Sequence, residues 1–185
     1  MNLKNNNYFI KGNHVYLRPF ELSDINKKYL SWMNNPLLNA GIEARFPISK
    51  VEAIKFYEDS KKTKDIIIFA ICDNKTNNHL GNCMISNLDW INKRCRYGRL
   101  IGENKKKGLG IGTEVTRLIQ NYVFNKLNFN TLYCAVNVNN KASIKSNIKS
   151  GMKIEGKSKE AMYFNGKYLD SINFGITKKE FLKLK

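Results

Sequence analysis

The residues best suited to chemistry lie between Lys105 and Glu114, where three lysines run into alternate glycines at Gly108, Gly110 and Gly112. Without a Cβ, the chain there can take positive φ and approach a ligand closely. Apolar residues recur at helical spacing just downstream, which predicts a helix whose first N–H groups have no partner within it. Such groups favour phosphate. We therefore predict an anion-binding turn, the alternative being a flexible loop with solvated lysines.

Two common phosphate-binding loops do not fit this segment. A P-loop requires Gly-x-x-x-x-Gly-Lys-Ser/Thr, whereas here the lysines precede the glycines. The Rossmann fingerprint Gly-x-Gly-x-x-Gly has a different spacing, and Cys134 stands near the place where that fold has an acidic residue. Neither fold is indicated.

The elements that position the turn follow from hydrophobic periodicity and from turn residues. Strands are predicted over residues 14–18, 66–72, 80–85, 96–101, 131–138, 153–164 and 167–176. Helices are predicted over residues 23–33 and 49–61, from the glycine turn through residue 123, and between residues 140 and 151. Asn165-Gly166 is a strong hairpin signal. These elements predict one α/β domain over residues 1–185, with a sheet of mixed strand direction.

The composition fits a folded and strongly basic domain. With 42% hydrophobic and 11% aromatic residues, the chain has enough apolar side chains for a core. It contains no apolar run of about 18 residues, so we expect a cytoplasmic protein without membrane insertion. A formal charge of +17 favours an anionic partner, which charge alone leaves open between nucleic acid, an acidic membrane surface and a phosphate-bearing substrate.

The cysteines do not indicate a metal site or a disulfide framework. There is no Cys-x-x-Cys, and the only histidines are His14 and His79. A cysteine nucleophile would need a histidine partner, so we expect buried structural thiols. The four thiols are Cys72, Cys83, Cys95 and Cys134.

The glycine segment resembles the acyl-CoA loop of the GCN5-related N-acetyltransferases, Arg/Gln-x-x-Gly-x-Gly/Ala after the fourth strand, with lysine in the first place. Similarity extends over most of the chain, through residues 14–19, 140–152 and 163–170. Within the superfamily it is closest in pattern to the branch of ribosomal-protein alanine acetyltransferases, which also holds amino-sugar acetyltransferases. The resemblance implies a mixed, mostly antiparallel sheet of about seven strands with flanking helices, splayed between its fourth and fifth strands.

The same resemblance implies acetyl-CoA as co-substrate, with no metal. Its pantetheine arm would pair with the backbone of Leu100 and Ile101, and Asn140 would both cap its helix and hold the arm. The pyrophosphate would lie on the turn formed by Lys107, Gly108, Leu109, Gly110, Ile111, Gly112 and Thr113.

The resemblance places the segment after the first helix over a small primary amine acceptor. Residues implied to bind the acceptor are Trp32, Asn35, Arg45 and Arg96. Trp32 serves equally well as a core residue. Together with Arg99, the arginines at 45 and 96 suit a diphosphate, which favours a nucleotide-linked amino sugar in surface-glycan biosynthesis.

Two other functions stay open at this point. One is acetylation of a protein N-terminus, and the other is a non-catalytic relative that binds CoA or nucleic acid. The aromatic stretch around Tyr163 and Tyr168 is the only candidate for stacking nucleic-acid bases, and a hairpin explains it equally well. We therefore do not expect nucleic acid as a partner, and a homodimer is compatible with the resemblance.

The catalytic base is where the chain departs from its relatives. Many of them hold a glutamate six residues before the glycine that ends the fourth strand, and here Arg96 stands six residues before Gly102. A guanidinium cannot act as a base. Glu43, in the acceptor segment, is our preferred replacement, and Glu103, Asp89 or a water chain are alternatives.

The catalytic acid departs as well. Where many relatives hold a tyrosine, this chain has Asn147, whose amide can hydrogen-bond a thiolate but cannot protonate it. Since the leaving thiol has a pKa of about 8.5, modest help is sufficient.

Overall fold

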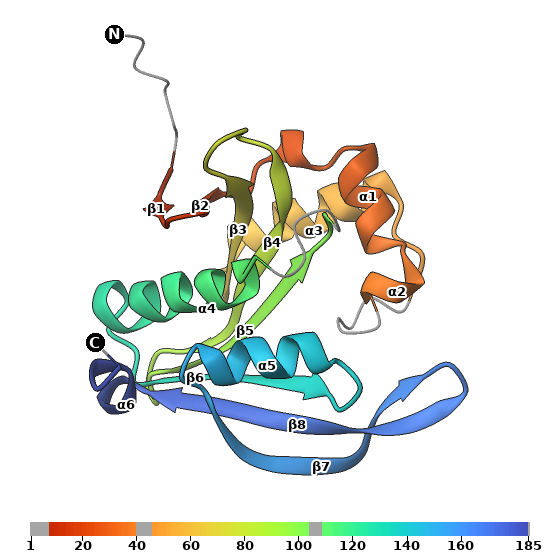
Figure 1. Cartoon of the computed structure of the whole chain (residues 1–185). Helices are drawn as coiled ribbons and strands as arrows, with labels where there is room; N and C mark the ends of the chain where they lie inside the picture. The colour runs from red at the N-terminus through yellow and green to blue at the C-terminus, as the bar shows by residue number, and fades with distance from the viewer. Residues whose placement is uncertain (1–7, 40–45, 104–108, 185) are drawn as a thin grey trace, which may run out of the picture.

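The computed structural model describes residues 8–39, 46–103 and 109–184. Eight strands form one open sheet in the order β1-β2-β3-β4-β5-β6-β8-β7 (Figure 1). The strands are β1 (Ile10–Lys11), β2 (Val15–Pro19), β3 (Ile66–Asp73), β4 (His79–Asp89), β5 (Arg94–Ile101), β6 (Thr131–Asn137), β7 (Lys153–Phe164) and β8 (Lys167–Thr177). The helices are η1 (Leu22–Asp24), α1 (Lys27–Met33), α2 (Pro36–Asn39), α3 (Lys50–Lys62), α4 (Ile111–Asn121), the π-helical η3 (Tyr122–Lys126), α5 (Lys141–Lys149) and α6 (Lys178–Leu182).

The splay predicted between the fourth and fifth strands is confirmed, and these strands are β5 and β6 because the short strand β1 precedes the predicted ones. All neighbouring strands pair antiparallel except β5 and β6, which run parallel and pair only at Arg94–Thr131, Cys95–Leu132 and Arg96–Tyr133. Beyond that point β5 continues along β4 while β6 continues along β8. Within the described residues, the stretch from Tyr97 to Ile101 therefore has a paired strand on one side only.

Two hydrophobic clusters lie on the two faces of the sheet. Because side chains alternate along a strand, odd and even positions of β5 face opposite sides. Tyr97 packs into the cluster that contains Val115 and Ile119 of α4. Leu100 packs into the cluster that contains Trp32 of α1 and residues of α3. Figure 1 shows α4 and α5 side by side on one face of the sheet.

The seven predicted strands are all present, and the short edge strand β1 adds an eighth. Asn165 and Gly166 take positive φ at the tip of the β7–β8 hairpin, as predicted. Ser49 caps α3 through the expected capping box with Glu52. At two residues β1 is too short to produce a period, and the same holds for the short helices α2 and α6.

The predicted start of the first helix is wrong. Asn26 is the N-cap of α1, and its side chain accepts hydrogen bonds from the N–H groups of Lys28 and Tyr29. Ser23 lies instead in the short helix η1. The carboxylate of Asp24 is held by Arg18 and by the Glu21 N–H, so this segment turns before α1 begins.

Candidate functional site

The described part of the glycine turn has the geometry of an anion site. Gly110 is the N-cap of α4 with φ of 76°, in the left-handed region where a side chain is disfavoured. A Cβ at Gly110 would have no atom within 4 Å among the described residues, so the space in front of the turn is open. The first helical bond within α4 runs from the Glu114 N–H to the Gly110 carbonyl, so the N–H groups of residues 111–113 precede it. Lys107 and Gly108 lie outside the described residues.

The side chains of the turn divide between core and solvent. Ile111 is buried in the cluster beneath α4, whereas Leu109 is exposed. Ile111 thus anchors the turn through its side chain. Any contribution of Ile111, Gly112 and Thr113 to an anion comes from their backbone N–H groups.

The turn lies close to the splayed part of β5, since a Cβ at Gly112 would come 3.2 Å from Arg99 Nε. Leu100 is buried and Ile101 half-buried, and their side chains pack into the two clusters, so only backbone is available to a ligand lying along β5. Unpaired strand backbone is suited to an extended polar chain such as a pantetheine arm. The structure therefore brings the predicted strand residues and the described turn residues together.

Helix α5 lies close to α4 at this place. Asn140 caps α5, because its Oδ1 accepts a hydrogen bond of 3.0 Å from the Ser143 N–H, which confirms the predicted capping. A Cβ at Gly112 would lie 3.0 Å from Ser146 Oγ and 3.2 Å from Arg99 Nε. Glycine at position 112 thus allows the first turn of α4 to approach Ser146 in the middle of α5.

Arg99 lies between these helices. Its Nη1 donates hydrogen bonds of 2.9 Å to Thr116 Oγ1 and to Asn147 Oδ1, and its Nη2 donates one of 3.4 Å to Ser143 Oγ. The expectation that Arg99 joins Arg96 at an acceptor diphosphate is wrong. The two residues are three apart on one strand, so their side chains face opposite sides of the sheet. This could have been predicted from the residue numbers, because side chains alternate along a strand.

Asn147 is occupied by neighbours. It is buried, its Oδ1 accepts from Arg99, and its Nδ2 lies 3.3 Å from Cys134 Sγ. The carboxamide therefore bridges β5 to β6 across the splay. Direct contact of Asn147 with a leaving thiolate stays a prediction.

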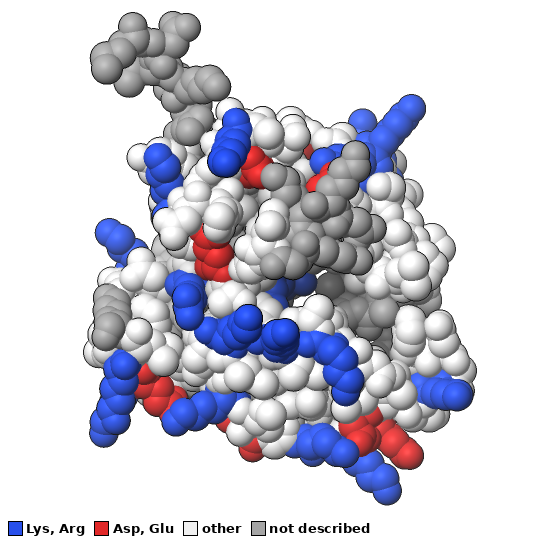
Figure 2. Space-filling model, in the orientation of Figure 1, with Lys and Arg blue, Asp and Glu red and all other residues white. Residues whose placement is uncertain are grey.

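The outer surface near the site is basic. Lys141, Lys145 and Lys149 are exposed at successive turns of α5. Figure 2 shows Lys and Arg in a row across this face, beside a hollow near its centre, with few acidic residues around them. This distribution suits a ligand that carries several phosphates.

The opposite face of β5 carries Arg96, one of the predicted acceptor residues. Arg96 is half-buried there, and Arg94, two residues earlier, lies 4.7 Å from the centre of the Tyr133 ring. Trp32 is 5% exposed and packs so closely on Gly102 that a Cβ there would overlap its indole. Trp32 is thus a core residue at the end of β5. Arg45 lies outside the described residues.

Asn35 has a local structural role. Its Oδ1 accepts a hydrogen bond of 2.9 Å from the Leu37 N–H, at the beginning of α2. The side-chain oxygen is therefore used by the backbone, and its predicted contact with an acceptor stays a prediction.

The candidate bases differ in position. Glu43 lies outside the described residues. Glu103 follows β5 and pairs with Lys28, with 3.5 Å between Oε2 and Nζ. Asp89 is the last residue of β4, where hydrogen bonds from the Asn92 side chain and backbone lower the pKa of its carboxyl, so Asp89 is a poor base.

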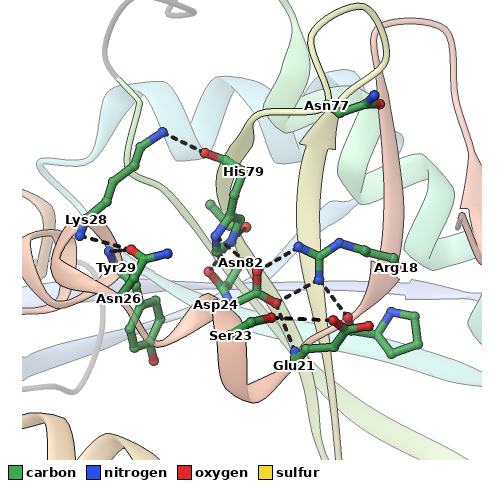
Figure 3. A network of polar contacts seen from close by, with 12 residues as sticks. Arg18, Glu21, Ser23, Asp24, Asn26, Lys28, Tyr29, Asn77, His79 and Asn82 are labelled. Carbon is green, nitrogen blue, oxygen red and sulfur yellow. Dashed lines mark hydrogen bonds and ion pairs between the residues drawn. The ribbon is translucent and has the colours of Figure 1, made fainter. Parts of the chain in front are cut away.

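A buried polar cluster formed by Arg18, Asp24, His79 and Asn82 was not predicted, because no sequence motif contains these residues (Figure 3). Arg18 donates two hydrogen bonds, of 2.7 and 2.6 Å, to the Asp24 carboxylate. His79 Nδ1 lies 3.6 Å from Asp24 Oδ1, and its Nε2 lies 3.0 Å from Asn82 Oδ1. Its members come from β2, η1 and β4, which only the fold brings together.

Burial and pairing set the ionisation of this cluster. Burial opposes the charge of Asp24, but hydrogen bonds from Arg18 and from the Glu21 N–H lower the pKa of its carboxyl below the ordinary value. Burial also lowers the pKa of His79, against the attraction of Asp24. At neutral pH the imidazole is therefore uncharged, and Arg18 and Asp24 form a balanced ion pair.

All four cysteines are buried and free, as expected. In the part of the chain that the structure describes, no group of three or more histidine, cysteine, aspartate or glutamate side chains is arranged to hold a metal ion. No helix among the same residues is long and apolar enough to cross a membrane.

Comparisons with known proteins agree with this geometry. The family model of the acetyltransferase (GNAT) domain matches residues 14–153. Bacillus subtilis (strain 168) YdaF, which has the provisional name of ribosomal N-acetyltransferase, is 29% identical over 100 residues. That match covers 54% of this chain and 54% of YdaF, so it spans about half the length of the curated relative.

Solved structures share the fold over nearly the whole chain. The spermidine N-acetyltransferase of Vibrio cholerae, in complex with CoA and spermine, superposes with a TM-score of 0.85 at 21% identity, covering 92% of this chain and 99% of that one. A GNAT-family acetyltransferase from Bacillus anthracis has a TM-score of 0.78 at 16% identity, covering 92% and 98%. With the splayed sheet and the glycine turn, the family match shows that this chain belongs to the GNAT acetyltransferase family.

Proposed function

We propose that the protein is an acetyl-CoA-dependent N-acyltransferase of small primary amines. The observation that carries this proposal is the splay between β5 and β6 together with the Gly110 turn, where no described atom lies within 4 Å of a Cβ placed on Gly110. The residues present fit the cofactor, because the turn supplies phosphate-binding N–H groups and β5 supplies unpaired backbone. Acetyl-CoA brings an activated thioester, and the chain supplies binding and orientation.

The acceptor lies on the other face of β5 in this proposal. Arg94 and Arg96 place two permanent positive charges there, which suits the diphosphate of a nucleotide-linked amino sugar. The formal charge of +17 opposes cationic acceptors such as the polyamine in the Vibrio complex. Protein N-terminal amines are a second candidate acceptor, favoured by the similarity to YdaF.

Deprotonation of the amine decides which acceptors react. No glutamate stands at position 96, so an acceptor that is partly neutral at pH 7 has an advantage. An α-amino group with a pKa near 8 is neutral in about one molecule in ten, whereas a lysine-like amine is neutral in fewer than about one in a thousand. This arithmetic favours sugar amines and protein N-termini over polyamines.

An acceptor panel tests the proposal. The purified protein is incubated with acetyl-CoA and, separately, with nucleoside-diphosphate amino sugars, N-terminal peptides and spermidine, and CoA release is measured. We expect the highest kcat/KM with an amino sugar. Transfer to spermidine alone would reject the acceptor assignment, and a lack of acetyl-CoA binding would reject the enzyme class.

The turn is tested by Gly110→Asn. Asparagine tolerates left-handed backbone, and its side chain enters open space, so the free energy of unfolding should change by less than about 1 kcal/mol. The side chain would occupy the volume proposed for the pyrophosphate, so the acetyl-CoA affinity should fall about tenfold or more. Unchanged affinity in the folded variant would remove the turn from the binding site.

A further inference from the structure

We infer that Arg99 is the group that stabilises the CoA thiolate as the acyl group leaves it, and that Asn147, Thr116 and Ser143 hold its guanidinium in place. This inference rests on the proposed function. In the reaction, the amine nitrogen bonds to the acyl carbon, the carbon–sulfur bond breaks, and sulfur leaves with the electron pair. The amine proton passes to a base or to water, so a negative charge appears on sulfur within the cleft.

Among the described residues, no negative charge balances that of Arg99. Its hydrogen-bond partners are the hydroxyls of Thr116 and Ser143 and the carboxamide of Asn147, and the Tyr97 hydroxyl also bonds to it; all are neutral. No described acidic side chain forms an ion pair with it. A guanidinium remains protonated at any physiological pH, so the cleft contains a permanent positive charge with neutral groups around it.

Titratable neighbours do not change this balance. The groups that interact with the charge of Arg99 are Cys83 on β4, Tyr97 on β5 and Cys134 on β6. Burial raises the pKa of Tyr97 to about 12 and that of Cys134 to about 11, and burial also raises the pKa of Cys83. All three are neutral at pH 7, and the contacting side chains of α4 and α5 do not ionise.

The guanidinium retains a donor for a ligand. Arginine has five N–H groups. The described contacts use both on Nη1 and one on Nη2, and the Tyr97 side chain is hydrogen-bonded to Arg99 as well, so at least one donor has no described partner. Nε and Nη2 lie beside the space that a Cβ at Gly112 would fill. Arg99 is only partly buried, so part of its side chain is accessible.

The position along β5 fits the sulfur of a bound acyl-CoA. If phosphates lie on the turn after β5, the thioester end points toward the closed end of the splay, at Arg96. Arg99 lies between the turn and that closed end. A positive group fixed in advance where negative charge develops lowers the barrier, because it need not reorganise during the reaction.

The proposal also accounts for Asn147. At the position where relatives hold a tyrosine, this residue does not need to donate a proton. It accepts a hydrogen bond from Arg99 and orients the guanidinium, and is thus a positioning residue. The charge of Arg99 would then stabilise the leaving thiolate, which in relatives is protonated by the tyrosine.

Binding of CoA and of acetyl-CoA, measured by calorimetry from about pH 6.5 to about pH 9.5, tests the inference on the wild-type protein. CoA has an ionisable thiol and acetyl-CoA does not, so the difference between their pH profiles reports the sulfur alone. If the site favours the thiolate, CoA affinity rises with pH by about tenfold for each unit by which its thiol pKa is lowered, and acetyl-CoA affinity does not. Identical profiles would overturn the inference.

Variants assign the effect to Arg99. Arg99→Gln keeps a polar side chain without charge and should remove the difference between the two ligands, whereas Arg99→Lys should retain it. Arg117→Met is the matched control, because Arg117 on α4 donates to the Lys149 carbonyl away from the splay. It should leave the difference intact.

Other results would contradict the assignment. A difference that survives Arg99→Gln would assign thiolate binding to another group. An equal loss of affinity for both ligands at every pH would place Arg99 at the phosphates. If Arg99→Gln does not fold, loss of the difference in Arg99→Lys would count against a charge effect. Failure of the wild type to bind acetyl-CoA would instead overturn the proposed function, and this inference with it.

Discussion

Two partly buried arginines, Arg18 and Arg99, lie on opposite faces of the sheet in opposite electrostatic situations. The side chain of Arg18 is 18% exposed and pairs with the Asp24 carboxylate at 2.6 Å. Arg99 has only neutral hydrogen-bond partners among the described residues. Both guanidinium groups are held by several bonds, and only the first has its charge neutralised.

The difference separates structure from function. A buried guanidinium with a carboxylate partner has its charge neutralised within the protein, and removing either partner destabilises the fold. A guanidinium held only by hydroxyl and amide groups has its charge neutralised only when an anionic ligand binds. Since Arg99 faces the cleft proposed for acyl-CoA and has no described acidic partner, we infer that the ligand supplies the negative charge.

The largest expected effect is the loss of stability when the charge of Arg18 is removed, compared with the same change at Arg99. Arg18→Gln leaves Asp24 buried and unpaired, so the free energy of unfolding at pH 7 should fall by about 3–5 kcal/mol. Arg99→Gln removes hydrogen bonds to neutral groups and should cost about 1–2 kcal/mol. Urea unfolding of both variants gives the two values. Equal losses in the free energy of unfolding would mean that the carboxylate partner of Arg18 makes no difference to stability.

A pH series sharpens the comparison. Because the native pKa of His79 lies below its ordinary value of 6.5, the unfolded chain binds a proton that the native one does not as the pH falls through about 6.5. Stability should therefore fall on the acid side, by up to about 1.4 kcal/mol per pH unit for one proton. The depressed pKa of Asp24 adds a further loss below its ordinary value of 3.8.

The thiol of Cys134, near Arg99, should make stability depend on pH in the alkaline range. The native pKa of Cys134 is raised to about 11, so above about pH 9 the unfolded chain releases a proton that the native one keeps, and stability falls with rising pH. Urea midpoints at about pH 5.5, 7.5 and 9.5 measure both limbs. His79→Gln should flatten the acid limb only. A change in the alkaline limb of that variant would contradict independence of the two regions.

The smallest expected effect comes from Gly112→Ala. Alanine improves helix propensity by up to about 1 kcal/mol, but its Cβ would lie 3.0 Å from Ser146 Oγ and 3.2 Å from Arg99 Nε. Stability should therefore change by less than about 1 kcal/mol, while the preference for thiolate over thioester weakens, because the guanidinium of Arg99 is displaced. Thermal unfolding and the CoA and acetyl-CoA titrations measure the two quantities. An unchanged preference would argue that the position of this guanidinium does not affect the ligand.

Local patterns predicted the frame of the molecule. Alternating apolar residues marked the strands, Asn165-Gly166 marked the hairpin, and the glycines marked the turn at α4. These signals are local because each depends on backbone conformation within a few residues. The splay came from family resemblance instead, since no local period distinguishes a strand that loses its neighbour.

The contacts of Arg18 and Arg99 could not be predicted from local sequence patterns. Arg18, Asp24 and His79 meet because three separate segments converge, and no spacing encodes that contact. The separation of Arg96 from Arg99 was available from strand parity. What surrounds Arg99, however, depends on how closely α4 and α5 approach, which is a property of tertiary packing.

The short parallel ladder between β5 and β6 also affects motion. Three residue pairs join an antiparallel unit of five strands to one of three, so apart from the two-residue edge strand β1 this seam is the shortest ladder in the sheet. Opening there breaks few backbone bonds, and amide hydrogens of β5 and β6 near the seam should exchange with solvent faster than those of β3 and β4. A ligand wedged between the two units fastens them together, so occupancy of the cleft should be visible as slower exchange on both sides of the seam.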